Sequence, residues 1–172
     1  GAGRTQRVPD AVTHPADATA DGPVPAARHL LSFDVEEYFQ VEAAARGGVT
    51  PDTWDAYPRR LAPAVDRILQ ALADHGTSAT FFVLGWVARH EPAIVRRIAD
   101  AGHEIASHGM GHRMLQHLDA AAFREDVDEA RRRLEDLAGR PVRGYRAPTF
   151  SVTHRTAWAI DVLAEAGFGY DS

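Results

Sequence analysis

The sequence predicts an α/β fold in which short buried strands alternate with amphipathic helices around a parallel sheet. Three observations support this prediction: the apolar runs are short, the stretches between them repeat apolar residues at helical spacing, and glycine or proline separates the two. With 172 residues, of which 45% are hydrophobic and 25% charged, the chain fits one domain with a sizeable core.

Residues 1–28 are expected to form a disordered leader ahead of a domain at 29–172. The leader has no aromatic residue and is rich in alanine, aspartate, threonine and proline, a composition that buries little apolar surface. A partner-binding tail is the alternative. No apolar run approaches the roughly 20 residues of a membrane span, so no transmembrane segment is expected. The start of the chain does not resemble a signal peptide, and the compartment stays open.

The first strand is predicted at 30–33 and the second at 80–83, where apolar residues are contiguous. His75-Gly76 ends the helix expected between these strands. The apolar residues of that helix are Leu61, Val65, Ile68, Leu69 and Leu72. They recur at helical spacing, which predicts one buried face.

A second helix is predicted to begin at Pro92, because proline suits the first helical turn. Its buried stripe consists of Ile94, Val95 and Ile98, and Gly102 ends it. A third strand is predicted immediately afterwards, at 104–107.

Asp119 is predicted to cap a long helix that Gly139 ends, and a fourth strand is predicted at 142–146. Thr153 is predicted to cap a last helix, followed by the start of a fifth strand at 168–170. A parallel strand without its crossover helix leaves an apolar face uncovered, so we expect a fragment of a larger domain. Five strands in an open doubly wound sheet are the alternative.

Polar residues follow three of the predicted strands, in the segments Ser32–Glu37, Ser107–His112 and Arg146–Phe150. Parallel α/β folds place their functional sites at the carboxyl ends of the strands. We therefore expect these three segments to meet at one site.

His108 and His112 are spaced so that both imidazoles could reach one metal ion, although two unrelated loop histidines would show the same spacing. Asp34 and Glu36 alternate along an extended strand, so both would face the site while Glu37 points elsewhere. One carboxylate could then bind the metal beside the two histidines, and the other could act as a general base. A solvated acidic turn is the alternative for the carboxylates.

Arg146 could hold the second carboxylate ionised and oriented through a charge-assisted hydrogen bond. Pro148 would stiffen the segment, and the backbone N–H of Thr149 could face a developing oxyanion. Tyr38 and Phe39 lie where an aromatic ring could stack on a sugar, with core packing as the alternative use. Together with Pro148 they are the candidate substrate-binding residues.

Composition excludes several classes of function. The chain has no cysteine, which rules out disulfides, thiolate metal sites and a cysteine nucleophile. The formal net charge is -5 and no block of lysine or arginine stands out, so we expect no nucleic-acid partner. Neither a serine-nucleophile elbow nor a nucleotide-binding glycine loop is present.

From about Leu30 onward the sequence resembles the polysaccharide deacetylases, also called the NodB-homology or carbohydrate esterase family 4 domain. Ser32–Glu36 is similar to the family motif Thr-Phe-Asp-Asp-Gly, and His108–His112 is similar to His-Ser/Thr-x-x-His. Arg146–Thr149 is similar to Arg-x-Pro-Tyr. The segment Phe33–Val41 is close to a bacterial branch that is associated with exopolysaccharide loci.

The resemblance implies a distorted (β/α) barrel of the NodB/glycoside hydrolase-deacetylase type, incomplete here at its C-terminus. It implies that Asp34 is the general base and that His108 and His112 bind a divalent metal, with zinc first and cobalt, nickel or manganese as alternatives. The family's metal carboxylate would stand at Val35, and we expect Glu36 to replace it.

By the same resemblance Arg146 orients the base and the N–H of Thr149 holds the oxyanion. The family's general-acid histidine lies in a later segment and is missing from this sequence. Gly109 stands where the family has a hydroxyl residue, and we expect it to loosen the loop.

The implied function is metal-dependent hydrolysis of N-acetyl groups on an acetylated polysaccharide or oligosaccharide. One alternative is an amide hydrolase acting on a small cyclic amide or ureide. Another, of a different class, is a catalytically inactive carbohydrate-binding domain.

Overall fold

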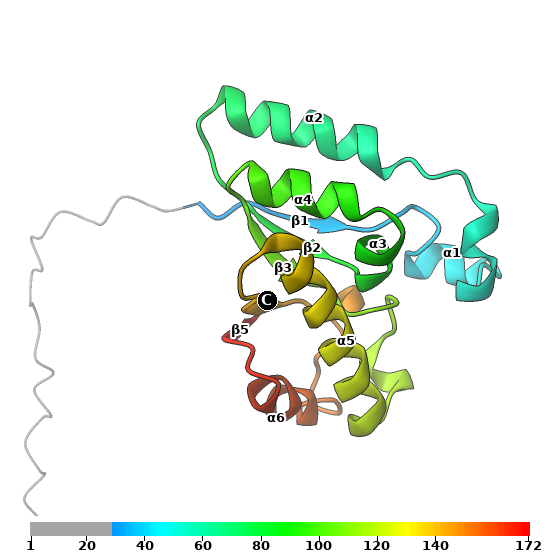
Figure 1. Ribbon diagram of the computed structural model, residues 1–172. Coiled ribbons are helices and arrows are strands. Elements are labelled where there is room, and N and C mark those ends of the chain that lie inside the picture. The colour runs from blue at the N-terminus through cyan, green and yellow to red at the C-terminus, as the bar shows by residue number, and fades with distance from the viewer. Residues whose placement is uncertain (1–28) are drawn as a thin grey trace, which may run out of the picture.

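The computed structural model describes residues 29–172, so the expected leader at 1–28 lies outside the described residues. A five-stranded parallel sheet forms the centre of the fold (Figure 1). Its strands are β1 (Ser32–Val35), β2 (Thr80–Val83), β3 (Glu104–Ser107), β4 (Gly144–Tyr145) and β5 (Tyr170–Asp171). The prediction of an α/β fold with a parallel sheet is confirmed.

Each strand pairs with the next strand along the chain, in the order β1-β2-β3-β4-β5. A doubly wound sheet reverses direction at a switch point, whereas a barrel wall keeps winding one way. The observed order is that of a barrel wall and excludes the doubly wound alternative for these five strands. All strands are parallel, so their carboxyl ends meet at one edge of the sheet.

The helices lie outside the sheet, with α2, α4 and α5 the longest of them (Figure 1). Helices α4 and α5 both contact β3, and α3 contacts both α4 and α5. The α-helices are α1 (Glu42–Arg46), α2 (Leu61–Asp74), α3 (Gly85–His90), α4 (Pro92–Asp100), α5 (Ala120–Ala138) and α6 (Trp158–Glu165). The 3₁₀ helices are η1 (Pro51–Ala56), η2 (Leu115–His117) and η3 (Pro148–Phe150). No helix of the described part is both long and apolar enough to cross a membrane.

Most of the predicted helix boundaries are confirmed by their capping geometry. The carboxylate of Asp119 accepts a hydrogen bond from the backbone N–H of Ala122 at 2.8 Å, as an N-cap should. Gly139 ends the same helix with a φ of 66°, a conformation that glycine adopts without strain. Pro92 occupies the first turn of α4, and His75 is the C-cap that follows the last residue of α2, Asp74.

Four boundaries differ from the prediction, one of them that of β5, which begins at Tyr170 and not at 168. Strand β1 begins two residues later than expected, because Ser32–Val35 pairs along β2 while Leu30 is 94% exposed. Strand β4 is reduced to Gly144–Tyr145. Thr153 does not cap α6, since its N–H donates to the Thr156 hydroxyl in a separate turn before the helix begins at Trp158.

The two faces of the sheet differ in polarity. Val35, Phe81, Val83 and Ile105 are buried in the main hydrophobic core. Ser32, Thr80 and Glu104 form one row across the opposite face, where the Thr80 hydroxyl donates to Glu104 at 2.6 Å. This polar face borders an open cavity of about 610 Å³. The strands therefore carry polar side chains on the face away from the helices and present their carboxyl ends to the site.

Candidate metal centre

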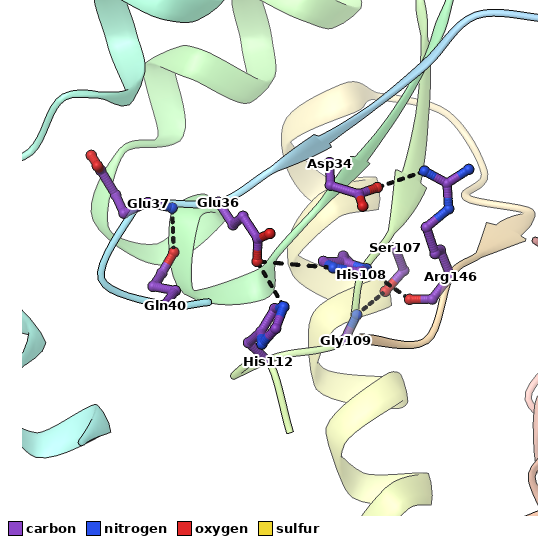
Figure 2. A network of polar contacts seen from close by, with 9 residues as sticks. All are labelled: Asp34, Glu36, Glu37, Gln40, Ser107, His108, Gly109, His112 and Arg146. Carbon is purple, nitrogen blue, oxygen red and sulfur yellow. Dashed lines mark hydrogen bonds and ion pairs between the residues drawn. The ribbon is translucent and has the colours of Figure 1, made fainter. Parts of the chain in front are cut away.

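Three side chains converge at the carboxyl edge of the sheet (Figure 2). Glu36 directly follows β1, His108 directly follows β3, and His112 lies at the end of the loop that begins at His108. One ligand atom from each residue lies within 4.8 Å of the other two. The structure thus brings together the carboxylate and the two histidines that the sequence predicts as metal ligands.

The Glu36 carboxylate has an oxygen that no hydrogen bond satisfies among the described residues. Its Oε2 is buried and forms no hydrogen bond, and it lies 2.9 Å from His112 Nε2 and 4.0 Å from His108 Nε2, at ion-pair distance from both imidazoles when these are protonated. A buried carboxylate oxygen without a donor is costly, and a cation relieves that cost. This donor set, two imidazoles and one carboxylate, fits a divalent metal such as zinc and leaves a position for water.

A hydrogen bond from the ring nitrogen that faces away from the cluster fixes the orientation of the His108 ring. Its Nδ1 lies 2.8 Å from the backbone carbonyl oxygen of Arg146, which can only accept, so Nδ1 carries a proton and Nε2 is the ring nitrogen that faces the cluster. Burial lowers the pKa of His108, although the nearby carboxylates of Asp34 and Glu36 act in the opposite direction. The neutral imidazole favoured by burial is the form that binds metal ions.

The loop between the two histidines is held from two sides. The Asp126 carboxylate, on α5, accepts a hydrogen bond from the Met110 N–H at 2.7 Å. At the start of α3 the N–H groups of Gly85 and Trp86 donate to the carbonyl oxygens of Gly109 and Met110, at 2.8 and 2.9 Å. The expectation that Gly109 loosens this loop is therefore wrong.

Gly109 is needed for this arrangement. Its φ is 76°, which strains any residue with a side chain. A Cβ atom there would also lie 2.9 Å from the Asp126 carboxylate oxygen. A hydroxyl residue at this position would displace the carboxylate that holds Met110.

Asp34 lies on the sheet face away from the helices, next to the metal cluster, and pairs with Arg146 (Figure 2). Arg146 Nη1 donates to Asp34 Oδ1 at 2.7 Å, and Nη2 donates to the hydroxyls of Ser32 and Ser172 at 2.9 Å. The guanidinium carbon lies 4.0 Å from the centre of the Phe82 ring. These contacts fix the guanidinium and leave Asp34 Oδ2 without a bond to it.

Glu37 points away from the cluster, as predicted, and has a structural role that the sequence did not reveal. Its Oε1 accepts hydrogen bonds from the backbone N–H groups of Arg60 and Leu61, at 2.8 and 3.0 Å. The carboxylate therefore caps the N-terminus of α2. No local pattern could have shown this, because the partners are more than twenty residues away in the sequence.

The candidate substrate-binding residues differ in exposure. Phe39 is 1% exposed and packs against the rings of Trp54, Tyr57 and Trp86, which is the core-packing alternative. Pro148 is also buried. Tyr38 is 44% exposed, so of the three it alone offers a ring to the surface.

Thr149 and Phe150 form an exposed turn after β4. Their φ angles are 56° and 50°, in the left-handed region. The N–H groups of Phe150 and Ser151 donate to carbonyl oxygens within the same turn, those of Ala147 and Pro148. Thr149, the predicted oxyanion residue, thus lies on the turn that follows the Arg146 backbone.

Comparisons with known proteins agree on one family. The family profile described as polysaccharide deacetylase matches residues 48–170. A chitooligosaccharide deacetylase from Sinorhizobium fredii is 41% identical over 100 residues, which cover 56% of this chain and 42% of that protein. A peptidoglycan-N-acetylglucosamine deacetylase from Bacillus cereus is 33% identical over 96 residues, which cover 55% of this chain and 35% of that protein.

A solved structure of a Mycobacterium smegmatis protein assigned to the polysaccharide deacetylases superposes with a TM-score of 0.65 at 33% identity. The match covers 83% of this chain and 49% of that structure. The chain thus spans about half the length of that structure, and less than half of the two curated relatives.

Proposed function

This chain belongs to the polysaccharide deacetylase family, and from that premise we propose that it forms the metal-binding part of an enzyme that hydrolyses N-acetyl groups on a glycan. The observation that carries the proposal is the convergence of Glu36, His108 and His112, in which a buried carboxylate oxygen faces two imidazoles without a hydrogen bond.

Glu36 Oε2 and the Nε2 atoms of His108 and His112 would hold the metal ion. When bound, a divalent ion supplies a Lewis acid that activates water and polarises an acyl oxygen. Zinc is the ion we propose first, because imidazole and carboxylate ligands suit it, with cobalt, nickel or manganese as alternatives.

Asp34 is the proposed general base. Arg146 holds Asp34 Oδ1, so Oδ2 is the oxygen that can accept a proton from the attacking water. The charge-assisted hydrogen bond fixes the orientation of the carboxylate, and the side chain of Arg146 is only 12% exposed. Proton transfer thus falls to one carboxylate and metal binding to the other, as the alternation along β1 predicts.

The turn after β4 would complete the site. The backbone N–H of Thr149 is the proposed donor to the developing oxyanion, and the buried Pro148 restricts the backbone beside it. Tyr38 is the proposed sugar-stacking residue because its ring is partly exposed.

The proposed substrate is a glycan that contains N-acetylglucosamine. The named substrates of the two curated relatives, chitooligosaccharide and peptidoglycan N-acetylglucosamine, share this sugar. An exopolysaccharide with N-acetylated sugars is a proposal that rests on the resemblance of Phe33–Val41 alone.

The test combines metal content with acetate release from N-acetylchitotetraose, for the protein extended to its natural C-terminus and for His108→Ala and His112→Ala in that protein. Near-stoichiometric metal and metal-dependent release, both lost in the variants, support a deacetylase. Metal without release from any acetylated glycan would favour the small-amide hydrolase. Sugar binding that neither requires metal nor changes in the variants would favour an inactive carbohydrate-binding domain.

A further inference from the structure

The ion pair between Asp34 and Arg146 is joined at a single point (Figure 2). Arg146 Nη1 donates to Asp34 Oδ1 at 2.7 Å, and no other hydrogen bond joins the two side chains among the described residues. Arginine and carboxylate groups frequently pair through two parallel hydrogen bonds, one to each carboxylate oxygen. The surroundings of Arg146 therefore have to explain why Asp34 Oδ2 receives no second bond.

Two serine hydroxyls use both hydrogens of the neighbouring guanidinium nitrogen. Arg146 Nη2 donates to Ser32 Oγ and to Ser172 Oγ, each at 2.9 Å. A terminal guanidinium nitrogen carries two N–H groups, so Nη2 has none left for Asp34. A second bond to Asp34 Oδ2, made by Nη2, would require one of the two serine bonds to break.

The sheet places the two serines. Ser32 and Asp34 are two residues apart on β1, so their side chains lie on the same face of the sheet. Ser172 directly follows β5, the neighbour of the strand that Arg146 follows. The backbone N–H of Ser172 donates to the carbonyl oxygen of Tyr145 at 3.0 Å, which continues the pairing of β5 with β4. Both hydroxyls are therefore positioned by strand geometry.

Aromatic rings restrict the guanidinium in another direction. Its carbon lies 4.0 Å from the centre of the Phe82 ring and 5.4 Å from the centre of the Phe150 ring. Stacking on a ring holds the guanidinium plane against that ring but does not fix its rotation within the plane. The hydrogen bonds to Ser32 and Ser172 therefore decide which nitrogen faces Asp34.

We propose that Ser32 and Ser172 are positioning residues that keep the pair of Asp34 and Arg146 at a single contact. This arrangement leaves Asp34 Oδ2 free to accept the proton of the attacking water. The proposal rests on the proposed function, which makes Asp34 the general base. Loss of the two hydroxyls would tighten the ion pair and thereby slow the reaction.

The test uses the zinc-loaded protein extended to its natural C-terminus, with the variants Ser32→Ala, Ser172→Ala and the double variant. Ser32→Thr retains a hydroxyl and is the rescue variant. Ser78→Ala is the matched control, because Ser78 is an exposed serine that lines the same cavity as Ser32 and does not bond to Arg146. Crystal structures show the contacts between Asp34 and Arg146, and acetate release from N-acetylchitotetraose gives kcat and KM.

In the double variant we expect Arg146 Nη2 to lie within about 3.2 Å of Asp34 Oδ2, a hydrogen-bond distance. The kcat should fall about tenfold while KM and zinc content stay unchanged, because a charge-assisted bond must break before Oδ2 can accept a proton. Each single alanine variant should lie between wild type and the double variant. Ser32→Thr and Ser78→Ala should match wild type in contacts and in kcat.

Two contacts between Asp34 and Arg146 in wild type, or a single contact in the double variant, would overturn the proposal. A Ser32→Thr variant as slow as Ser32→Ala, or a Ser78→Ala variant as slow as the double variant, would also overturn it.

The two readouts separate this result from the proposed function. If wild type and the double variant release acetate equally fast, the deacetylase proposal stands and the positioning role fails. If wild type releases no acetate but the ion pair gains its second contact in the double variant, the serines hold Arg146 as proposed and the hydrolytic function fails.

Discussion

The loop after β3 and the turn after β4 both border the candidate site, but they are anchored differently. The β3 loop, from His108 to His112, receives hydrogen bonds from the start of α3 and is held by Asp126 of α5. In the β4 turn, Phe150 and Ser151 bond only to carbonyl oxygens of their own turn, and Phe150 is 65% exposed. The difference indicates that the candidate metal ligands are preorganised, whereas the β4 turn is less constrained by the rest of the fold.

Removing a histidine from the β3 loop should have the largest effect on zinc binding. His112→Ala should weaken zinc binding by more than about 100-fold, because loss of outer partners alone costs about 10- to 100-fold. The metal content of the purified protein and competition with a chelator measure the effect. His154→Ala, at an exposed histidine before α6, is the control and should retain the metal. Equal metal content in both variants would show that the cluster is not the metal site.

Removing the support of the β3 loop should have the next largest effect. Asp126→Ala leaves the Met110 N–H without its acceptor, and we expect about 10-fold weaker zinc binding and a loss of about 1–3 kcal/mol in the free energy of unfolding. Chelator competition and urea denaturation measure the two quantities. Asp128→Ala, at a half-buried position on the same helix where the carboxylate pairs only with Arg124 of the same helix, should change neither by a comparable amount. Normal zinc binding by Asp126→Ala would show that Asp126 does not preorganise the β3 loop.

The same carboxylate predicts a pH dependence. Burial raises the pKa of Asp126, and the Met110 N–H only partly opposes this. Because the pKa is higher in the folded than in the unfolded protein, the folded state binds more protons, and the contribution of Asp126 to stability falls as pH rises through the interval above 3.8. Asp126→Asn should therefore gain stability relative to wild type as pH rises through this interval. Urea denaturation of both proteins at several pH values tests this, and a constant difference would contradict it.

The smallest effect is expected in the β4 turn. Thr149 has a φ of 56°, which is unfavourable for a β-branched residue and tolerated by asparagine. Thr149→Asn should therefore stabilise the protein by about 0.5–1 kcal/mol and leave zinc binding unchanged. Thermal denaturation and chelator competition provide the measurement. A destabilised variant would mean that the threonine side chain contributes more to this turn than its exposure indicates.

Most of the fold could be predicted because its signals are local. Helical spacing, the Asp119 cap and the proline at the start of α4 depend on residues within one or two turns of each other. The boundary of β1 could not be predicted in the same way. Leu30 and Leu31 are as apolar as a buried strand, and only the pairing of Val35 with Val83 shows where the strand lies.

The convergence of the candidate metal ligands could be predicted from the sequence, but the residues that hold the surrounding backbone in place could not. Glu36, His108 and His112 follow strand ends, and parallel strands place those ends together. Asp126 and Gln40 carry no such signal. An aspartate in the middle of an amphipathic helix usually faces solvent, and a glutamine after a strand usually does too. Only the packing of α5 against the β3 loop buries the first, and only the turn from Glu37 buries the second.

The two neighbouring glutamates after β1 couple the metal cluster to the outer layer of the protein. Glu36 faces the imidazoles, while Glu37 binds the first N–H groups of α2. An ion that immobilises Glu36 therefore also restrains the peptide from which the helix cap extends. By thermodynamic linkage, tighter docking of α2 would strengthen ion binding to the same extent that the ion strengthens docking. A bound metal ion would then stabilise the docking of α2 in addition to taking part in the proposed reaction.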